Sequence, residues 1–327
     1  MIESTRRQLM AAMALTGLAW SVTGFTQRFP EKLITIVVAY PPGSDTDVMA
    51  RLYGEKLASR LRQPVLVVNR AGASGMVGSS YVAHAAADGY TLLFAPSTFA
   101  TAPLVLKRAD SVGYNPVTDF ASVIQTSTSS MLLVANPSAG FKNLADVLQA
   151  SKQGKALTYG TSGSGSPMHI LGEWLNRATG AKLQHVPYKG VVPSVTDVVA
   201  GHIPVAFVTV GVAREYLRAG KLAAIAVADP GRSPFLPDVP TIAESGYPEV
   251  RLRAWNASFA PAGTPAPVVR LLNEQLAEVL RLPDVIEKLA GLSAVPAGGL
   301  PESLGTQVAS DYDQLGQRIR ELRIQAD

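Results

Sequence analysis

The sequence predicts an α/β protein made of two doubly wound α/β domains joined by a hinge. Along most of the 327 residues, apolar runs of strand length alternate with segments of helical periodicity, which is typical of a doubly wound sheet. The alternation pauses at a serine- and threonine-rich stretch, residues 126–130, and then starts again. A helical tail follows. If that tail packs back on the first domain, the chain crosses between the domains twice, and such a two-crossing hinge permits closure around a ligand.

The first series of elements is a β-α-β-α-β alternation. Its expected strands are residues 33–40, 65–68 and 91–95, and its expected helices are residues 48–61 and 75–87. The first strand is apolar without interruption, as expected for a parallel strand that is buried on both faces.

The second series repeats this pattern and ends in the helical tail. The expected strands are residues 131–135, 157–159, 183–186, 205–208, 222–227 and 255–260. The expected helices are residues 144–150, 167–178, 194–200, 213–219, 267–280, 283–289 and 301–324. Proline and glycine in residues 230–248 exclude a regular element there. We therefore expect one domain at residues 29–125 with 254–327, and a second at 126–253.

Composition excludes several classes of function. Hydrophobic residues make up 47% and charged residues 17% of the chain, with a net charge of +4, which fits an ordinary globular protein. The basic residues are scattered, so nucleic-acid binding is not expected. No cysteine is present, which excludes disulfides, cysteine metal sites and a lipid anchor on cysteine. No metal or cofactor is expected at the isolated histidines, His84, His169, His185 and His202.

The N-terminus has the pattern of a cleavable export signal, residues 1–28. Arg6 and Arg7 precede an apolar run at residues 9–19, which is too short to span a bilayer comfortably. The arginine pair partly matches a twin-arginine signal, and an ordinary Sec signal is the alternative. Cleavage is expected between residues 19 and 29, so the mature protein is expected outside the cytoplasm.

Two glycine-rich loops are the strongest functional motifs. The first loop is residues 40–47 and the second loop is residues 159–167, roughly 120 residues apart, and each follows a strand and opens a helix. Such a turn presents backbone N–H groups at the positive end of a helix dipole, where an anion binds well. A plain helix cap or a flexible turn is the alternative for each loop. One loop per domain predicts a protein that clamps a small anion.

No motif for catalysis is present, and no catalytic residue is assigned. A dinucleotide motif starting at Gly163 would need glycine where Met168 stands. A nucleophile elbow at Ser162 fails because Ser164 replaces its second glycine. We therefore expect a binding protein rather than an enzyme, with an exported α/β hydrolase as a less favoured alternative.

Many short motifs occur in one order along the chain and resemble those of a known family. They are Tyr40-Pro-Pro-Gly43, Asp47 with Ala50-Arg51, Asn69-Arg70-Ala-Gly72, Asp88-Gly89-Tyr90, Asp119-Phe120, Ser162 to Ser166, His185-Val-Pro-Tyr-Lys-Gly190, Ala219-Gly220-Lys221, Pro237-Asp-Val-Pro-Thr241 and Ala260-Pro-Ala-Gly-Thr-Pro265. Together they resemble the Bug family, the TctC-like periplasmic solute-binding receptors of tripartite tricarboxylate transporters.

The resemblance implies a periplasmic-binding-protein (Venus-flytrap) architecture with a small carboxylate in the cleft between the domains. It also implies membrane transporter subunits as partners, or a sensor partner if the protein is an orphan receptor, and a monomeric, periplasmic chain. Carried over residue by residue, the ligand-binding positions are Tyr40, Pro42, Gly43, Ser44, Thr46, Ser97, Thr98, Ser162, Gly163, Ser166, His169, Tyr188, Lys189 and Gly190.

The chain departs from the family pattern in ways that bear on the ligand. Ser44 stands where the family has a second glycine, and Val208-Thr209 stands where an acidic residue often follows the strand. We find no acidic residue for a ligand amine, and Lys189 is the one positive charge that a motif places. The sequence therefore predicts a small mono- or dicarboxylate rather than citrate or glutamate.

Overall fold

The computed structural model describes residues 29–106, 113–153 and 157–324. Everything below concerns one compact unit, residues 32–327. The expected export signal, residues 1–28, lies outside the described residues. Within the described residues, no helix is both long and apolar enough to cross a membrane.

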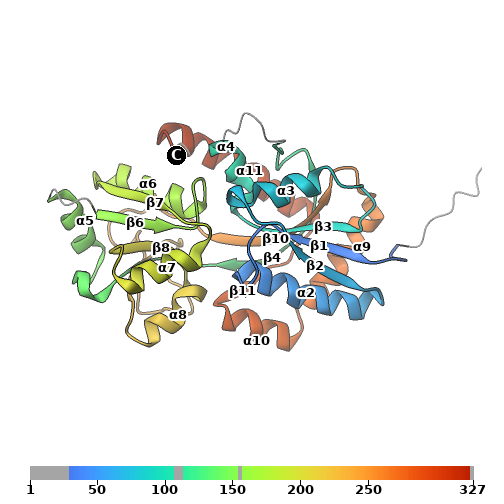
Figure 1. Ribbon diagram of the computed structural model, residues 1–327, viewed down its shortest axis with the longest axis horizontal. Coiled ribbons are helices and arrows are strands. Elements are labelled where there is room, and N and C mark those ends of the chain that lie inside the picture. Colours follow the sequence, from blue (N-terminus) through green and yellow to red (C-terminus); the bar gives the residue numbers. More distant parts are fainter. Residues whose placement is uncertain (1–28, 107–112, 154–156, 325–327) are drawn as a thin grey trace, which may run out of the picture. The chain divides into compact units, whose positions relative to one another are not determined.

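The first sheet has six strands in the order β11-β4-β10-β3-β1-β2 (Figure 1). Its strands are β1 (Ile34–Val38), β2 (Val65–Asn69), β3 (Thr91–Pro96), β4 (Phe120–Ser129), β10 (Ala254–Pro261) and β11 (Ala294–Pro296). Strand β1 pairs in parallel with β2 and β3, whereas β10 is antiparallel to both β3 and β4. The sheet is therefore mixed, with a parallel part formed by the first series of elements.

The second sheet has five strands in the order β7-β6-β8-β5-β9. Its strands are β5 (Met131–Ala135), β6 (Leu157–Thr161), β7 (Leu183–Pro187), β8 (Val205–Thr209) and β9 (Ala223–Val227). Strand β6 is parallel to β7 and β8, and β5 is antiparallel to β8 and β9. Its parallel part again comes from a β-α-β-α-β run of the chain.

Helices connect the strands of both sheets. The helices before β5 are α2 (Asp45–Leu61), α3 (Met76–Ala83) and α4 (Thr98–Val105), with the short 3-10 helix η1 (Ala73–Gly75). Those between β5 and β9 are η2 (Pro137–Ala139), α5 (Leu144–Lys152), α6 (Pro167–Thr179), α7 (Val191–Ala200) and α8 (Val210–Arg218). The tail contains α9 (Ala266–Val279), α10 (Pro283–Gly291) and α11 (Pro301–Glu321).

The predicted α/β class with two sheets is confirmed. Besides the short 3-10 helices η1 and η2, three elements were not predicted. These are α4, β11 and β4, and β4 includes residues 126–129 of the stretch that had been interpreted as a break between domains. Polar residues can occupy this buried strand because their hydroxyls are bonded: the Thr126 hydroxyl donates to the carbonyl of Asn256 at 3.1 Å. Satisfied hydrogen bonds remove most of the cost of burying such groups.

The chain passes between the two sheets twice. The first crossing is Ser130, between β4 and β5, and the second is residues 228–253, between β9 and β10. The two crossings are bonded to each other, because the buried carboxylate of Asp229 accepts hydrogen bonds from Ser130 at 2.8 Å and from Arg253 at 3.0 Å.

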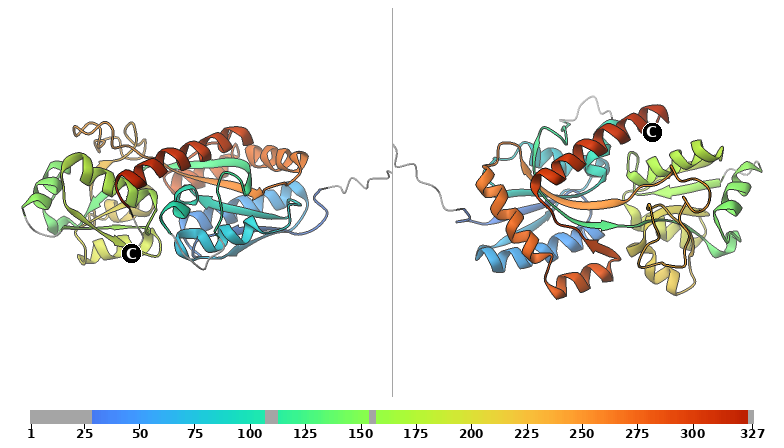
Figure 2. Two further views of the ribbon diagram at one scale, coloured as in Figure 1. Left: turned by 90° about the horizontal axis from the view of Figure 1, so that it is seen from above. Right: turned by 180° about the vertical axis from the view of Figure 1, so that it is seen from behind.

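The C-terminal helix α11 also connects the two sides. Figure 2 shows α11, the long red helix, lying beside elements of both sheets. Buried residues of α4, α6 and α11, including Val105, Ile170 and Ile319, form one apolar cluster. The guanidinium of Arg318 lies over the ring of Trp174, 4.4 Å from its centroid. The tail therefore packs on elements of both sheets.

Candidate functional site

A cavity of about 410 Å³ lies between elements of the two sheets. Its lining residues are 40–46, 96–98, 129, 131, 162, 167, 168, 189–193, 209 and 254–256. Most of them follow the carboxyl ends of parallel strands, which is where α/β sheets bind ligands. Strand β10 runs antiparallel to β3, and its first residues meet the end of β3, with Asn256 opposite Pro96. This register adds β10 to the cavity wall.

Five helices begin at this cavity. The first residues of α2, α4, α6 and α7 line it, and Thr209, which also lines it, directly precedes α8. The first backbone N–H groups of a helix have no acceptor within the helix and carry the positive end of its dipole. Several such ends around one small cavity favour a bound anion.

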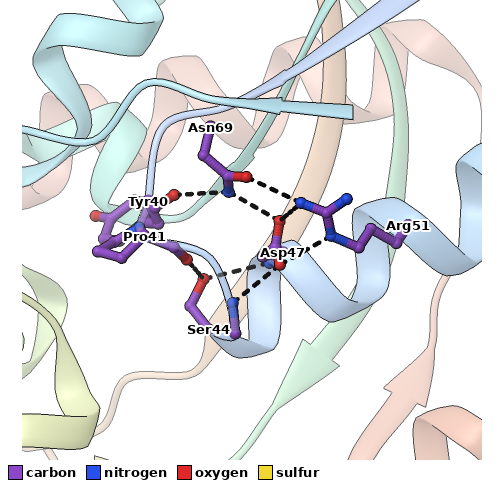
Figure 3. Close-up of polar contacts among 7 residues, drawn as sticks. Tyr40, Pro41, Ser44, Asp47, Arg51 and Asn69 are labelled. Atoms are coloured by element: carbon purple, nitrogen blue, oxygen red, sulfur yellow. Dashed lines mark hydrogen bonds and ion pairs between the residues drawn. The ribbon is translucent and has the colours of Figure 1, made fainter. Parts of the chain in front are cut away.

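The first loop is held by a network centred on the buried carboxylate of Asp47 (Figure 3). This carboxylate accepts hydrogen bonds from the Gly43 N–H at 2.9 Å, from Arg51 Nε at 3.1 Å and from Asn69 Nδ2 at 2.8 Å. The Asn69 amide also donates to the carbonyl of Tyr40 at 3.0 Å. These bonds fix the path of the loop from its first residue to the start of α2.

The same network explains the charge state of Asp47. Burial by itself would raise the pKa of this carboxyl, but the hydrogen bonds from Arg51, Gly43 and Asn69 and the charge of Arg51 outweigh it and hold the pKa below the ordinary value. The motif residues Asp47, Arg51 and Asn69 thus build the loop rather than line the cavity.

The second loop is held mainly by its own backbone and by His169. Ser166 caps α6 by accepting from the His169 N–H at 3.3 Å, and His169 Nδ1 accepts from the Gly165 N–H at 3.2 Å. The Gly163 N–H donates to the hydroxyl of Thr161 at 3.2 Å. From the sequence, glycines of both loops were expected to let the backbone approach the ligand. The N–H groups of Gly43, Gly163 and Gly165 are instead bonded within the protein.

His169 is buried and its ring stacks on that of His185, with 3.6 Å between the centroids. Burial and the neighbouring His185 lower the pKa of His169 to about 3. The imidazole is therefore neutral near pH 7, as the bond from the Gly165 N–H to Nδ1 requires.

The second loop also touches the first-sheet side directly. The hydroxyl of Ser74 donates to the carbonyl of Ser164 at 3.0 Å, and that of Thr101 donates to the carbonyl of Gly165 at 2.7 Å. A second cavity of about 560 Å³ lies next to this contact, lined by residues 71–75 of one side and 162–164 and 187–190 of the other.

The structure brings together most of the fourteen residues predicted from the sequence. Those that line the first cavity are Tyr40, Pro42, Gly43, Ser44, Thr46, Ser97, Thr98, Ser162, Lys189 and Gly190. Gly163 and Tyr188 line the second cavity instead. Ser166 and His169 line neither of these two cavities; they lie behind the second loop and support it.

Some hydroxyls that were expected to face the ligand are already donating within the protein. Tyr188 donates to Asp197 at 2.6 Å, Tyr40 donates to the carbonyl of Ser74 at 3.2 Å, and Ser44 donates to the carbonyl of Pro41 at 2.8 Å. A hydroxyl has a single proton to donate, so these three groups offer a ligand only their oxygen.

Four polar residues of the cavity were not assigned to it from the sequence: Asp45, Ser129, Thr209 and Asn256. Asn256 Oδ1 accepts from the Thr46 hydroxyl at 3.3 Å, which leaves its NH₂ group as a donor. The sequence predicted no acidic residue at the site, and the structure places one, Asp45, in the lining of the cavity. Among the described residues that line the cavity, Asp45 is the one carboxylate and Lys189 the one cation.

Comparisons with known proteins show the family of this chain. The family model described as "Tripartite tricarboxylate transporter family receptor" (TctC) matches residues 49–318. The protein BugT of Bordetella pertussis is 35% identical over 312 residues, which is 94% of each chain.

Solved structures are similar over nearly the whole chain. The R. palustris protein Rpa4515, solved with adipate, has 32% identity and a TM-score of 0.85 over 91% of this chain and all of the other. MatC of Rhodopseudomonas palustris, solved with bound malate, has 30% identity and a TM-score of 0.82 over 89% of this chain and all of the other. The family model and these relatives lead to one conclusion: the chain belongs to the family of tripartite tricarboxylate transporter receptors.

Proposed function

We propose that this chain is a periplasmic solute-binding receptor that captures a small carboxylate in the 410 Å³ cavity and presents it to the membrane subunits of a tripartite tricarboxylate transporter. Its family supports the role of receptor. Two of its structural relatives were solved with adipate and with malate, both small carboxylates. The absence of a catalytic motif in the sequence supports binding without turnover.

The observation that carries the proposal is the set of helix N-termini around the cavity. The first N–H groups of α2, at Asp45 and Thr46, and of α7, at Val191 and Val192, belong to lining residues. Neutral donors and dipole ends of this kind stabilise one carboxylate without a dedicated cation. They do not offset the three charges of a tricarboxylate, because burying unpaired charge is costly.

We further propose that the two sheets are the cores of two domains that close on the ligand. The division expected from the sequence is residues 29–125 with 254–327 against 126–253. Because the end of β4, up to Ser129, pairs in the first sheet, we place the first boundary at Ser130. The chain then has two crossings, at Ser130 and at residues 228–253, and a hinge at these segments would allow closure.

In this proposal, the predicted residues that line the cavity contact the ligand, and Ser166 and His169 hold the second loop in place. The periplasmic location follows from the family and from the expected export signal. We propose transport rather than sensing because the family is one of transporter receptors. Uptake measured with and without the transporter's membrane subunits distinguishes the two roles.

The test begins with the native protein and its own ligand. Native mass spectrometry of protein purified from the periplasm should show a bound species with the mass of a small carboxylic acid. Calorimetry with acetate, butyrate, succinate, malate, adipate and citrate then ranks the ligands. We expect one or more of the mono- or dicarboxylates to bind more tightly than citrate. If none of these acids binds, and no amino carboxylate of the same length binds either, the proposal is contradicted.

A pair of matched variants locates the site. Val192 lines the cavity and Val77 lies on α3 away from it, and each side chain is 48% exposed. Val192→Trp should fill part of the cavity and weaken carboxylate binding by roughly tenfold or more, which corresponds to about 1.4 kcal/mol. Val77→Trp should leave the affinity unchanged. Equal affinities of the two variants would place the ligand elsewhere.

A further inference from the structure

Asp45 is an acidic residue inside a cavity that otherwise fits an anion. It is the first residue of α2 and lines the cavity from the first-sheet side. The hydroxyl of Thr209, at the end of β8 in the second sheet, donates to Asp45 Oδ2 at 3.2 Å. The Asp45 carboxylate of the first-sheet side is thus bonded to the second-sheet side. Its partner Thr209 belongs to the pair Val208-Thr209, where the sequence has no acidic residue.

Asp45 forms no ion pair among the described residues, and Lys189 is the one cation that lines the same cavity. This distinguishes it from the buried carboxylates of Asp47, which pairs with Arg51, and of Asp229, which pairs with Arg253. Burial raises the pKa of the Asp45 carboxyl, and the hydrogen bond from Thr209 offsets this only in part. An uncompensated carboxylate in a cavity is costly, and a ligand that brings a positive group removes that cost.

A structural role for Asp45 is the alternative. An acidic residue in the first turn of a helix stabilises the helix through its dipole. Asp47 lies in the same first turn and already places a carboxylate there. That role also gives no reason for the contact with Thr209, which comes from the other sheet.

We propose that Asp45 is the residue that determines specificity in this cleft, and that it selects carboxylates that also carry a protonated amine over dicarboxylates. This inference rests on the proposed function. The ligand carboxylate would lie at the helix N-termini, and its ammonium group would donate to Asp45. A dicarboxylate would place its second negative charge in a cavity that already contains the charge of Asp45.

The experiment compares ligands of equal length that differ only in the second group. The six-carbon set is hexanoate, adipate and 6-aminohexanoate, and the four-carbon set is butyrate, succinate and 4-aminobutyrate. 2-Aminohexanoate and 2-aminobutyrate place the amine beside the carboxylate. Calorimetry measures the affinity of each for the wild type, for Asp45→Asn and for Glu302→Gln. The last variant removes one exposed charge from the first turn of α11, far from the cavity in sequence and absent from its lining.

We expect the wild type to bind an amino carboxylate more tightly than the dicarboxylate of the same length. Asp45→Asn should weaken the amino carboxylate by roughly 10- to 100-fold, the range for a hydrogen bond between charged groups, and should strengthen the dicarboxylate. The preference therefore reverses. Glu302→Gln should keep the wild-type ranking. The position of the amine in the best ligand shows whether Asp45 reaches the near or the far end of the bound molecule.

Two results separate failure of the inference from failure of the receptor function. If carboxylates bind and Asp45→Asn leaves their ranking unchanged, Asp45 does not set specificity and the receptor function stands. If no carboxylate or amino carboxylate binds the wild type, both proposals are wrong. Should Asp45→Asn fold poorly by circular dichroism, Asp45→Glu replaces it. The longer acid should keep the preference for an amine but shift it toward a shorter ligand, and a preference for dicarboxylates in this variant would overturn the inference.

Discussion

Asp47 does not line the cavity, yet the first loop depends on its carboxylate. It accepts from the Gly43 N–H, from Arg51 and from Asn69, and so joins the loop to α2 and to the end of β2 (Figure 3). The motif spacing of these residues is therefore explained by loop construction. At the scale of single residues, the site therefore has residues of two kinds. Asp47 and its partners fix the backbone of the first loop, and others, including Asp45 and Thr98, line the cavity.

Removal of the Asp47 carboxylate should weaken both the fold and the binding of ligand. Asp47→Ala leaves the Gly43 N–H and the guanidinium of Arg51 without their acceptor, which should lower the free energy of unfolding by about 2–4 kcal/mol. Carboxylate affinity should fall as well, because the first loop loses its fixed conformation. Chemical denaturation and calorimetry measure the two effects.

The control for this variant is Glu215→Ala. Glu215 pairs with Arg218, and both side chains are more than 60% exposed, at 76% and 63%, so its removal should change stability by at most about 0.5 kcal/mol. A small change for Asp47→Ala as well would show that the network is not needed for the loop.

His169 predicts a defined dependence of stability on pH. Its pKa is about 3 in the folded chain, against 6.5 ordinarily, so between these values the unfolded chain holds one more proton at this site. The free energy of unfolding should therefore fall as pH drops from about 6.5 toward 3, by about 1.4 kcal/mol per pH unit from this residue.

Denaturation curves of the wild type and of His169→Asn, measured at several pH values, test this prediction. The variant cannot take up that proton, so its stability should decline less steeply than that of the wild type over the same range. His84→Asn, which changes an exposed histidine, should follow the wild-type slope. Parallel slopes for the wild type and His169→Asn would show that His169 titrates alike in the folded and unfolded chain.

At the scale of elements, the second loop joins β6 to α6 and at the same time meets the first-sheet side. Gly163 has a φ of 133° and Gly165 a φ of 75°, which side chains other than glycine rarely adopt. A Cβ atom on Gly163 would lie 2.9 Å from the Ser74 hydroxyl, and one on Gly165 would lie 2.9 Å from Val105 Cβ. The glycines are therefore needed for contact between the two sides as much as for approach to a ligand.

Gly163→Ala should disturb this contact. The added methyl group displaces Ser74, whose hydroxyl bonds to Ser164, so we expect carboxylate affinity to fall by roughly tenfold, or about 1.4 kcal/mol. Gly140→Ala is the matched control, because Gly140 also has a positive φ, of 75°, but no atom within 4 Å of the added group. It should cost stability through backbone strain, about 1 kcal/mol, and leave the affinity measured by calorimetry unchanged.

A substitution in the core of strand β5 should lower stability without changing ligand binding. Leu132 is fully buried in the strand that pairs with β8 and β9. Leu132→Ala should lower the free energy of unfolding by about 2–5 kcal/mol through the cavity that it leaves. Leu66→Ala, at a site that is 49% exposed on β2, should have a much smaller effect. Thermal melts compare the two, and similar melting temperatures would contradict the assignment of β5 to the core.

At the scale of the whole molecule, the two sheets are linked by the crossings and by α11. The crossings share the buried carboxylate of Asp229, which accepts from Ser130 in one and from Arg253 in the other. Helix α11 packs through Ile319 against Ile170 of α6. Any closure of one side on the other must therefore pivot at the Asp229 network and shift or bend along the α11 contact.

Asp229→Ala should loosen the link between the crossings. Arg253 and Ser130 lose their common acceptor, so we expect a loss of about 2–4 kcal/mol in the free energy of unfolding. Glu249→Ala, an exposed residue of the same connecting segment, is the control and should have little effect.

Ligand binding measures whether the loosened variant keeps its affinity. A carboxylate at 100 times its dissociation constant should stabilise the wild type by about 2.7 kcal/mol. Comparison at one fixed ligand concentration should give a smaller shift in melting temperature for Asp229→Ala, because its affinity is reduced. An undiminished shift would show that the network supports the fold but not the binding.

The sequence by itself determined the class of fold, the two series of elements and the two loops. These depend on local properties: apolar periodicity, glycine at turns, and a helix-capping residue such as Ser166 before Pro167. It also determined the family, because the motif residues that build the first loop, such as Asp47 and Asn69, lie at fixed spacing.

Only the tertiary structure decided which polar groups remain for a ligand and which are used within the protein. The hydroxyl of Tyr188 and the N–H of Gly163 looked available in the sequence, but each has a partner inside the fold. Conversely, no sequence pattern placed Asp45 in the cavity, where the hydroxyl of Thr209, 164 residues later in the chain, donates to it. Such pairings depend on how two sheets are placed in space, and this placement arises from packing between distant segments rather than from any local pattern.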